Sequence, residues 1–392
     1  MEVVAPQPPQ YIIHQFLLIF IKMKYLILSL IILSCSCSKK EQIEDVTKFI
    51  FNEETNIDFK KDIECSFIPL ETTDSCLCGS ISAVKIVDDK IYIINQESKR
   101  LLVFDTSGKF ITQIGRRGNG PGEYMSVNNF HIDKEKQIIT LADAYQAKIF
   151  HYSLKDYQYI NTQKSPYFSD CCWLPDGNIA WVFCGGYNTG KRDMHYVKIT
   201  DPQLNTITLL YPTDFTPEYM MIPHLIFYTF NQKCYLNLPF VPIIHEVTSD
   251  KLIPTYQLEL GKHKFASSEW LKTNVKNNYY ETISNSNYIS GQHVKETENY
   301  ICVEYYIEGM NQYIGFYNKK TGASFIQKGS DFAKHIGLNG FNQLKGTHED
   351  YFIFSTLPST FARFKNSSED SKPIMGNIKE DDNPILCLVK FK

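Results

Sequence analysis

The feature that most constrains the fold is a repeated pattern of short apolar segments separated by turn residues. The clearest copy spans 81–115, where four such segments are joined by turns that contain Asp88, Asp89 and Gly108. Aspartate and glycine at these places permit the tight hairpin turns that connect antiparallel strands. This copy therefore predicts a four-stranded antiparallel meander.

The same pattern recurs five more times along the chain. The further copies lie at 129–160, 172–210, 225–260, 300–327 and 341–391. Repeats with a period of roughly 40 to 65 residues are typical of β-propellers. A single meander exposes unpaired strand edges, and closing the units into a ring protects those edges. We therefore predict an all-β fold, a six-bladed β-propeller of four-stranded antiparallel blades that occupies 61–392.

Two segments complete this architecture. The apolar stretch 67–70 precedes the first copy, and we expect it to supply a missing strand to the last blade and so close the ring. The segment 261–299 interrupts the strand pattern between the fourth and fifth copies. Either Ser267 or Ser268 can cap a short helix there, with Glu269 in its first turn. We predict a helical insertion near 261–299, packed over one rim.

The first forty residues carry the features of an export signal. A positive start at Met23 and Lys24 precedes an apolar run at 25–33 and then Cys35. This run is too short to cross a bilayer as a helix, and its length is that of a signal-peptide core. The sequence ILSC at 32–35 resembles the bacterial lipobox, in which the cysteine is acylated after cleavage. We predict that Cys35 carries lipid, palmitate included.

Two alternatives stand beside this interpretation. Cys37 is a second candidate for acylation, but the polar Ser34 stands three residues before it, which favours Cys35. An uncleaved anchor helix starting at Gln15 is the other alternative. Lys22 and Lys24 interrupt its apolar run, which favours a cleaved signal peptide.

The segment 1–22 fits neither role, because its start is unlike the short positive region of a signal peptide. We expect translation to start at Met23. The predicted organisation is a signal peptide at 1–34 and a lipidated N-terminus and tether at 35–60. The predicted location is the outer membrane of the cell envelope, facing the periplasm or the cell surface.

The stretch 113–124 reads QIGRRGNGPGEY, with LLVFDTSGKF before it at 101–110 and FHID after it at 130–133. Together these resemble a family of bacterial six-bladed propeller lipoproteins, which is similar to the NHL-repeat propellers. The FIPLETT that starts at Phe67 and the NPIL that starts at Asn383 also resemble the ends of that family. The resemblance covers almost all of the mature chain. It implies the propeller fold and no particular activity.

Charge and cysteine spacing exclude several classes of site. With 40 basic and 43 acidic residues the chain lacks the basic surface that nucleic acid requires. The pairs Cys76 with Cys78 and Cys171 with Cys172 are too close for the usual zinc spacing, so we interpret the eleven cysteines as mainly structural. We predict no cofactor, and a monomer, because a closed ring needs no partner.

Histidines could hold a metal in the axial channel if different blades supplied them. His131, His195 and His245 are the candidates for such a set. A histidine in or beside a strand is more often a core or surface residue, so we predict no metal site. The paired carboxylates at 88–89 and 381–382 lie in expected turns. No GxSxG nucleophile motif occurs, so no catalytic residue is predicted.

The glycine-rich stretch 115–122 superficially resembles a phosphate-binding loop. Such loops open a helix and end in a lysine followed by serine or threonine, and both features are missing here. We interpret the stretch as a crossover between blades. Arg116 and Arg117 could still contact an anionic ligand from this rim, because guanidinium groups suit carboxylates and phosphates. With Glu123 and Tyr124 they form the predicted ligand-binding residues.

Two functional hypotheses follow from this pattern. The first is a membrane-anchored binding or scaffold protein whose propeller presents its rim or channel mouth to a glycan, a peptide or a protein. The alternative is a lyase or hydrolase of the NHL-like type with its site in the channel. The enzyme requires acidic or histidine side chains from at least three blades that converge on the axis.

Overall fold

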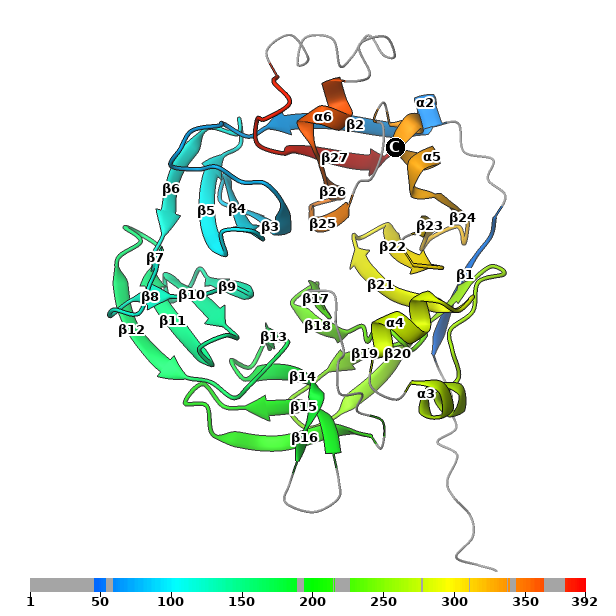
Figure 1. The fold of residues 1–392 in the computed structure, drawn as a ribbon, viewed down its shortest axis with the longest axis horizontal. Coiled ribbons are helices and arrows are strands. Elements are labelled where there is room, and N and C mark those ends of the chain that lie inside the picture. The colour runs from blue at the N-terminus through cyan, green and yellow to red at the C-terminus, as the bar shows by residue number, and fades with distance from the viewer. Residues whose placement is uncertain are drawn as a thin grey trace, which may run out of the picture. The chain divides into compact units, whose positions relative to one another are not determined.

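The computed structural model describes residues 46–53, 59–188, 194–213, 215, 226–275, 278–309, 311–336, 338, 343–362 and 378–392. The unit that begins at Val46 is a six-bladed β-propeller, in which six sheets surround a central axis (Figure 1). The predicted fold class is therefore confirmed. Within these described ranges no helix is long and apolar enough to span a membrane. The predicted signal peptide and Cys35 lie outside the described residues.

The first three blades are consecutive meanders, and in each the strand nearest the axis comes first in the chain (Figure 1). Blade 1 consists of β3 (Ile81–Val87), β4 (Lys90–Asn95), β5 (Arg100–Asp105) and β6 (Phe110–Ile114). Blade 2 consists of β9 (Asn129–Asp133), β10 (Ile138–Asp143), β11 (Lys148–Ser153) and β12 (Tyr159–Lys164). Blade 3 consists of β13 (Asp170–Trp173), β14 (Ile179–Asn188), β15 (Met194–Thr200) and β16 (Thr206–Thr213).

The remaining blades follow the same plan, with two contributions from the N-terminal part of the propeller. Blade 4 consists of β17 (Phe227–Phe230), β18 (Lys233–Leu236), β19 (Ile243–Val247), β20 (Leu252–Leu260) and the added β1 (Thr47–Phe51). Blade 5 consists of β21 (Ile289–Glu296), β22 (Tyr300–Ile307), β23 (Asn311–Asn318) and β24 (Ser324–Lys328). Blade 6 consists of β25 (Gln343–His348), β26 (Tyr351–Thr356), β27 (Ile385–Phe391) and β2 (Ile63–Pro69).

Ring closure occurs as the sequence indicated. Strand β2 pairs antiparallel with β27, from Ile63 opposite Phe391 to Pro69 opposite Ile385. The outermost strand of the last blade thus comes from the N-terminal side of the first blade. Because this pairing joins the two ends of the ring, neither end is left as an open strand edge.

The predicted tether at 35–60 needs correction. Strand β1 pairs parallel with β20, and its Phe49 and Phe51 side chains are only 4% and 1% exposed. This segment is therefore part of blade 4, and the propeller starts before residue 61. The segment of β1 has only five residues, two of them buried, and it therefore gives a weak sequence signal for a strand. The strand is stabilised by the long edge of β20, which the sequence of β1 does not reveal.

The insertion between blades 4 and 5 is also shorter than predicted. Helices α3 (Ser268–Asn274) and α4 (Tyr279–Ser284) lie in 261–299, but β21 already begins at Ile289. Ser267 caps α3, since its hydroxyl accepts a hydrogen bond of 3.1 Å from the Trp270 amide. Three further short helices are α2 (Phe59–Asp62), α5 (Gly329–His335) and α6 (Pro358–Ala362).

The apolar core lies between adjacent blades. Between blades 1 and 2, for example, Tyr92 and Leu101 pack with Phe130 and Phe150 in one buried cluster. Similar clusters fill other spaces around the ring. Large aromatic side chains suit this position because facing sheets need bulky residues to fill the gap between them.

A second, polar set of contacts bridges the same blade interfaces near the axis. Between blades 1 and 2, the Lys85 ammonium donates to the carbonyl of Phe130. Asn129 of blade 2 donates to Asp170 of blade 3 at 2.8 Å, and the amide of Phe227 in blade 4 donates to the other Asp170 oxygen at 3.0 Å. One buried carboxylate thus holds three consecutive inner strands together.

The other half of the ring uses the same device. The Gln292 amide of blade 5 donates to Asn237 next to β18 at 2.7 Å, and the amide of Leu344 in blade 6 donates to Glu304 in blade 5 at 2.6 Å. Asn383, just before β27, accepts from the amide of Cys78 at 2.6 Å, just before β3. We call Lys85, Asn129, Asp170, Gln292, Glu304 and Asn383 the inter-blade belt. These side chains fix the inner strands and therefore the shape of the channel.

Candidate functional site

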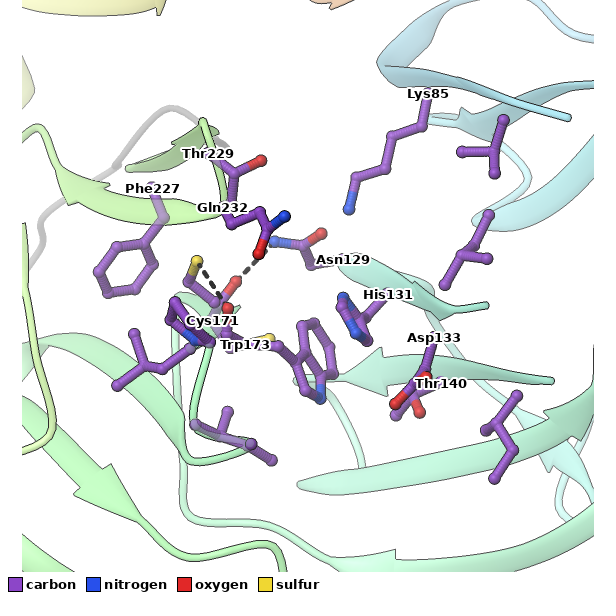
Figure 2. Close-up of a pocket in the computed structure, with 18 of the residues that line it drawn as sticks. Lys85, Asn129, His131, Asp133, Thr140, Cys171, Trp173, Phe227, Thr229 and Gln232 are labelled. Carbon is purple, nitrogen blue, oxygen red and sulfur yellow. Dashed lines mark hydrogen bonds between the residues drawn. The ribbon is translucent and has the colours of Figure 1, made fainter. Parts of the chain in front are cut away.

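A cavity of about 890 Å³ opens at the axis and extends between blades 2 and 3. Its walls include the inner strands of all six blades. The inner-strand residues that matter below are Lys85, Asn129, Trp173, Thr229, Lys295 and Lys345. Figure 2 shows several of these side chains around one open space, with Lys85 reaching toward it from blade 1. A concave site of this size is typical of small-molecule binding.

Three lysines from neighbouring inner strands line this cavity. Lys85 belongs to β3, Lys295 to β21 and Lys345 to β25, so they come from blades 1, 5 and 6. Lys295 is 9% exposed and Lys345 is 7% exposed. Lysine is almost never buried to this degree without a paired charge. Their positions are therefore unusual for a purely structural role.

The three ammonium groups have few partners within the protein. Lys85 donates to the Phe130 carbonyl and lies 4.5 Å from the centre of the Phe130 ring. Lys345 donates to the side chain of Gln343. Among the residues that the structure describes, Lys295 has no hydrogen bond or ion pair. Each ammonium has three donors, so most of them are left for a molecule in the cavity.

Burial lowers the pKa of all three lysines, and Lys295 and Lys345 keep their charge at neutral pH. The pKa of both Lys295 and Lys345 falls to about 8, mainly because the ammonium loses its hydration. The charge of Lys85 contributes to the lowered pKa of Lys295, and burial also lowers the pKa of Lys85. The floor of the cavity is therefore positively charged at pH 7.

The carboxylates behind this floor are already fully bonded. Asp170 accepts from Asn129, from Phe227 and, at 2.8 Å, from the amide of Cys171. Burial raises the pKa of Asp170, and these donors oppose the rise. Because every contact has Asp170 as acceptor, its geometry suits the ionised form. Glu304 likewise only accepts, from Leu344 and two side chains.

The wider part of the cavity is aromatic and polar. The rings of His131 and Trp173 stack with their centres 5.1 Å apart and their planes 14° apart, as Figure 2 shows. Burial, together with the charge of Lys85, lowers the pKa of His131 to about 4, so this imidazole is neutral at pH 7. Further along blade 2, His151 contacts Thr140 at 3.0 Å and Gln163 at 3.2 Å.

The structure places the predicted ligand-binding residues elsewhere. Arg116 and Arg117 form β7 (Arg116–Arg117), which pairs with β8 (Glu123–Tyr124) between the outer parts of blades 1 and 2 (Figure 1). Arg116 is 80% exposed and pairs with Glu123 at 2.6 Å, while Tyr124 is buried and donates to the carbonyl of Ile114. None of the four lines the cavity. A ligand-binding role for this rim stays a prediction.

The three candidate histidines are not brought together. His131 faces the cavity, whereas His195 lies on β15 and His245 on β19, the third strands of their blades. In the described part of the chain no group of three or more histidine, cysteine or acidic residues is placed to hold a metal. Among the described residues that line the cavity, the acidic and histidine side chains come from blades 2 and 3 and not from the three blades that the channel enzyme requires.

The sequence pattern does not single out the three lysines. Two of them follow apolar residues, as in Ala83-Val84-Lys85 and Leu344-Lys345-Gly346, and Lys295 stands between Val294 and Glu296. In an alternating strand such a lysine is expected to face solvent. One signal could have found them. The first strand of a propeller blade faces the axis, and the first strands of three different blades each contain one of these lysines.

Comparison with known proteins agrees with the architecture. A family model described as a 6-bladed beta-propeller matches residues 38–355. A solved protein of Bacteroides fragilis, described as exported, is 26% identical with a TM-score of 0.82 and covers 88% of this chain and 100% of its own. A Bacteroides vulgatus protein of another uncharacterised family is 11% identical with a TM-score of 0.47, covering 84% of this chain and 98% of its own.

No curated protein matches the chain. The family match nevertheless extends over most of the sequence, from before blade 1 to the end part of β26 in blade 6. The chain therefore belongs to this family of six-bladed β-propellers.

Proposed function

We propose that this protein is an exported binding protein of the bacterial cell envelope, and that its axial cavity is the binding site. The observation that carries the proposal is the cavity of about 890 Å³, lined by all six inner strands and by lysines from three of them. A rigid ring held by the inter-blade belt keeps such a site preformed, which reduces the entropy lost on binding.

Export is supported by two independent observations. The N-terminal sequence carries a lipobox-like ILSC at 32–35 after a signal-peptide core. The Bacteroides fragilis protein to which the chain is similar is described as exported. We propose an outer-membrane lipoprotein whose tethered propeller meets a glycan, a peptide or a protein partner outside the cytoplasm. One acyl chain alone binds membranes weakly, so stable anchoring requires the several chains of a mature lipoprotein.

Lipidation is tested by metabolic labelling with an alkyne analogue of palmitate in a bacterial host. We expect the wild-type protein to carry the label and Cys35→Ala to lose all of it, because the acylated residue is gone. The matched control is Cys37→Ala, which is expected to keep the label. Label retained in Cys35→Ala and lost in Cys37→Ala would place the lipid on Cys37. Label absent from the wild type would disprove the lipoprotein assignment.

The binding site is tested by filling it. Thr229 is an exposed side chain of β17 that lines the cavity, so Thr229→Trp places an indole in the space that a ligand needs. For any ligand found by calorimetry against panels of glycans, peptides and envelope proteins, we expect at least about a tenfold loss of affinity, or 1.4 kcal/mol. The control Thr206→Trp, on the outer strand β16, is expected to bind like the wild type.

Two outcomes would contradict this site. A ligand that binds Thr229→Trp as tightly as the wild type would have to bind outside the axial cavity. Failure of the folded wild-type protein to bind anything in the panels would remove the support for a binding function. Thermal unfolding of both variants shows whether a loss of affinity reflects a filled cavity or a damaged fold.

A further inference from the structure

We propose that the axial cavity binds the carboxylate of an acidic sugar, held by the ammonium groups of Lys85, Lys295 and Lys345. This inference rests on the proposed binding function and names its ligand class. The three lysines come from three neighbouring blades and line one cavity. Figure 2 shows the Lys85 side chain extended into that space, facing the residues of blades 3 and 4.

Within the described part of the chain, the ammonium of Lys295 has no anion in direct contact, although the charge of the Asp170 carboxylate opposes the lowering of its pKa. Lys295 is 91% buried and has no hydrogen-bond or ion-pair partner among the described residues. An unpaired buried charge is strongly unfavourable, so such groups are normally paired or bind a ligand. Lys85 and Lys345 each have one neutral acceptor and further donors to spare. A bound anion would accept hydrogen bonds from the remaining N–H groups of all three lysines.

The carboxylates that line the cavity do not fill this role. Asp133 accepts from the Lys136 ammonium at 2.8 Å, toward the rim. Asp176 accepts from Ser249 and, at 3.1 Å, from Asn178. Glu135 is exposed in the turn after β9. These carboxylates are therefore hydrogen-bonded to other side chains or exposed to water. The ammonium groups of the three lysines remain available to a ligand.

The charge balance favours a monoanion. The described residues that line the cavity include four lysines and three carboxylates, which leaves one positive charge in excess when the histidines are neutral. One carboxylate neutralises that excess, whereas a phosphate dianion exceeds it. The described residues that line the cavity also include no arginine and no helix residue, whereas phosphate sites commonly use arginine forks or a helix N-terminus.

The rest of the cavity suits a sugar ring. Beyond the lysines its walls present neutral amides and hydroxyls, which can pair with sugar hydroxyls as donors and as acceptors. These side chains are Asn161, Gln163, Thr229, Asn231 and Gln232. The half-buried Trp173 adds apolar surface for the C–H faces of a ring. The cavity volume is large enough for a short oligosaccharide.

The test is calorimetric titration of the full-length protein with galacturonate, glucuronate and trigalacturonate. Neutral probes are galactose and glucose, and inorganic phosphate is a third arm. We expect the acidic sugars to bind at least about tenfold more tightly than the neutral ones, with affinity falling as salt rises. Lys295→Met is expected to lose at least about tenfold in affinity for the acidic sugars, while Lys320→Met, in an exposed turn, keeps it.

The outcomes separate this inference from the proposed function. Neutral and acidic sugars that bind equally, and equally in Lys295→Met, would overturn the acidic class but keep a binding cavity. Phosphate that binds more tightly than any acidic sugar would overturn the choice of carboxylate. If no acidic sugar binds while another ligand does, and Thr229→Trp blocks that ligand, the inference fails and the proposed function stands. Insensitivity of all binding to Thr229→Trp would remove both.

Discussion

Asp170→Ala is expected to lower the free energy of unfolding by about 3 to 5 kcal/mol, enough to unfold a protein of ordinary stability in part. The substitution removes the acceptor for three buried donors, in Asn129, Cys171 and Phe227, and each unsatisfied donor costs about 1 to 3 kcal/mol. It also removes a carboxylate whose charge favours the ammonium form of Lys295. Urea unfolding followed by circular dichroism measures the loss.

Two further variants define the cause. Asp381→Ala changes an exposed turn residue and is expected to shift stability by less than about 0.5 kcal/mol. Asp170→Asn keeps the size of the side chain and one acceptor oxygen, so it should lose less stability than Asp170→Ala. A loss below about 1 kcal/mol in Asp170→Ala would show that the blades do not depend on this carboxylate.

The blades could be predicted because their determinants are local. Turn residues such as Asp88, Asp89 and Gly108 lie where hairpins need positive φ, with values of 48°, 58° and 88°. The alternation of apolar residues between them then sets which face of each strand is buried. The closing strand was also accessible, since Ile63–Pro69 has its own apolar pattern and the last repeat lacked a strand.

Features that depend on distant partners were not accessible. Strand β1 is stabilised by an edge about two hundred residues away. The lysines were missed for a related reason. The alternation of apolar and polar residues shows that each lysine lies on the strand face opposite the apolar core. Only closure of the ring turns this face of an inner strand toward the enclosed axis.

Lys295→Met is expected to raise the free energy of unfolding of the ligand-free protein at pH 7 by about 1 to 4 kcal/mol, because burial lowers the pKa of Lys295 from 10.5 to about 8 and each pKa unit corresponds to about 1.4 kcal/mol. Methionine has similar length and no charge to desolvate. Lys320→Met, in solvent, is the matched control and is expected to change stability by less than about 0.5 kcal/mol.

The effect has a defined pH dependence. The pKa of Lys295 in the folded protein is about 8, below the ordinary value near 10.5 that applies on unfolding. Between these values the folded state holds fewer protons than the unfolded state, so this lysine makes wild-type stability rise with pH. Its penalty is complete below pH 8 and vanishes toward pH 10.5. The advantage of Lys295→Met should therefore be largest at pH 7 and shrink at pH 10.

A destabilised Lys295→Met would mean that the protein already neutralises this ammonium, and a bound anion would no longer be needed. If the variant is instead more stable and binds acidic sugars more weakly, stability and affinity change in opposite directions. That combination is expected when a charge is kept buried for a ligand, because only a bound anion recovers the cost of its burial. The opposite signs would distinguish a binding group from a structural one without a structure of the complex.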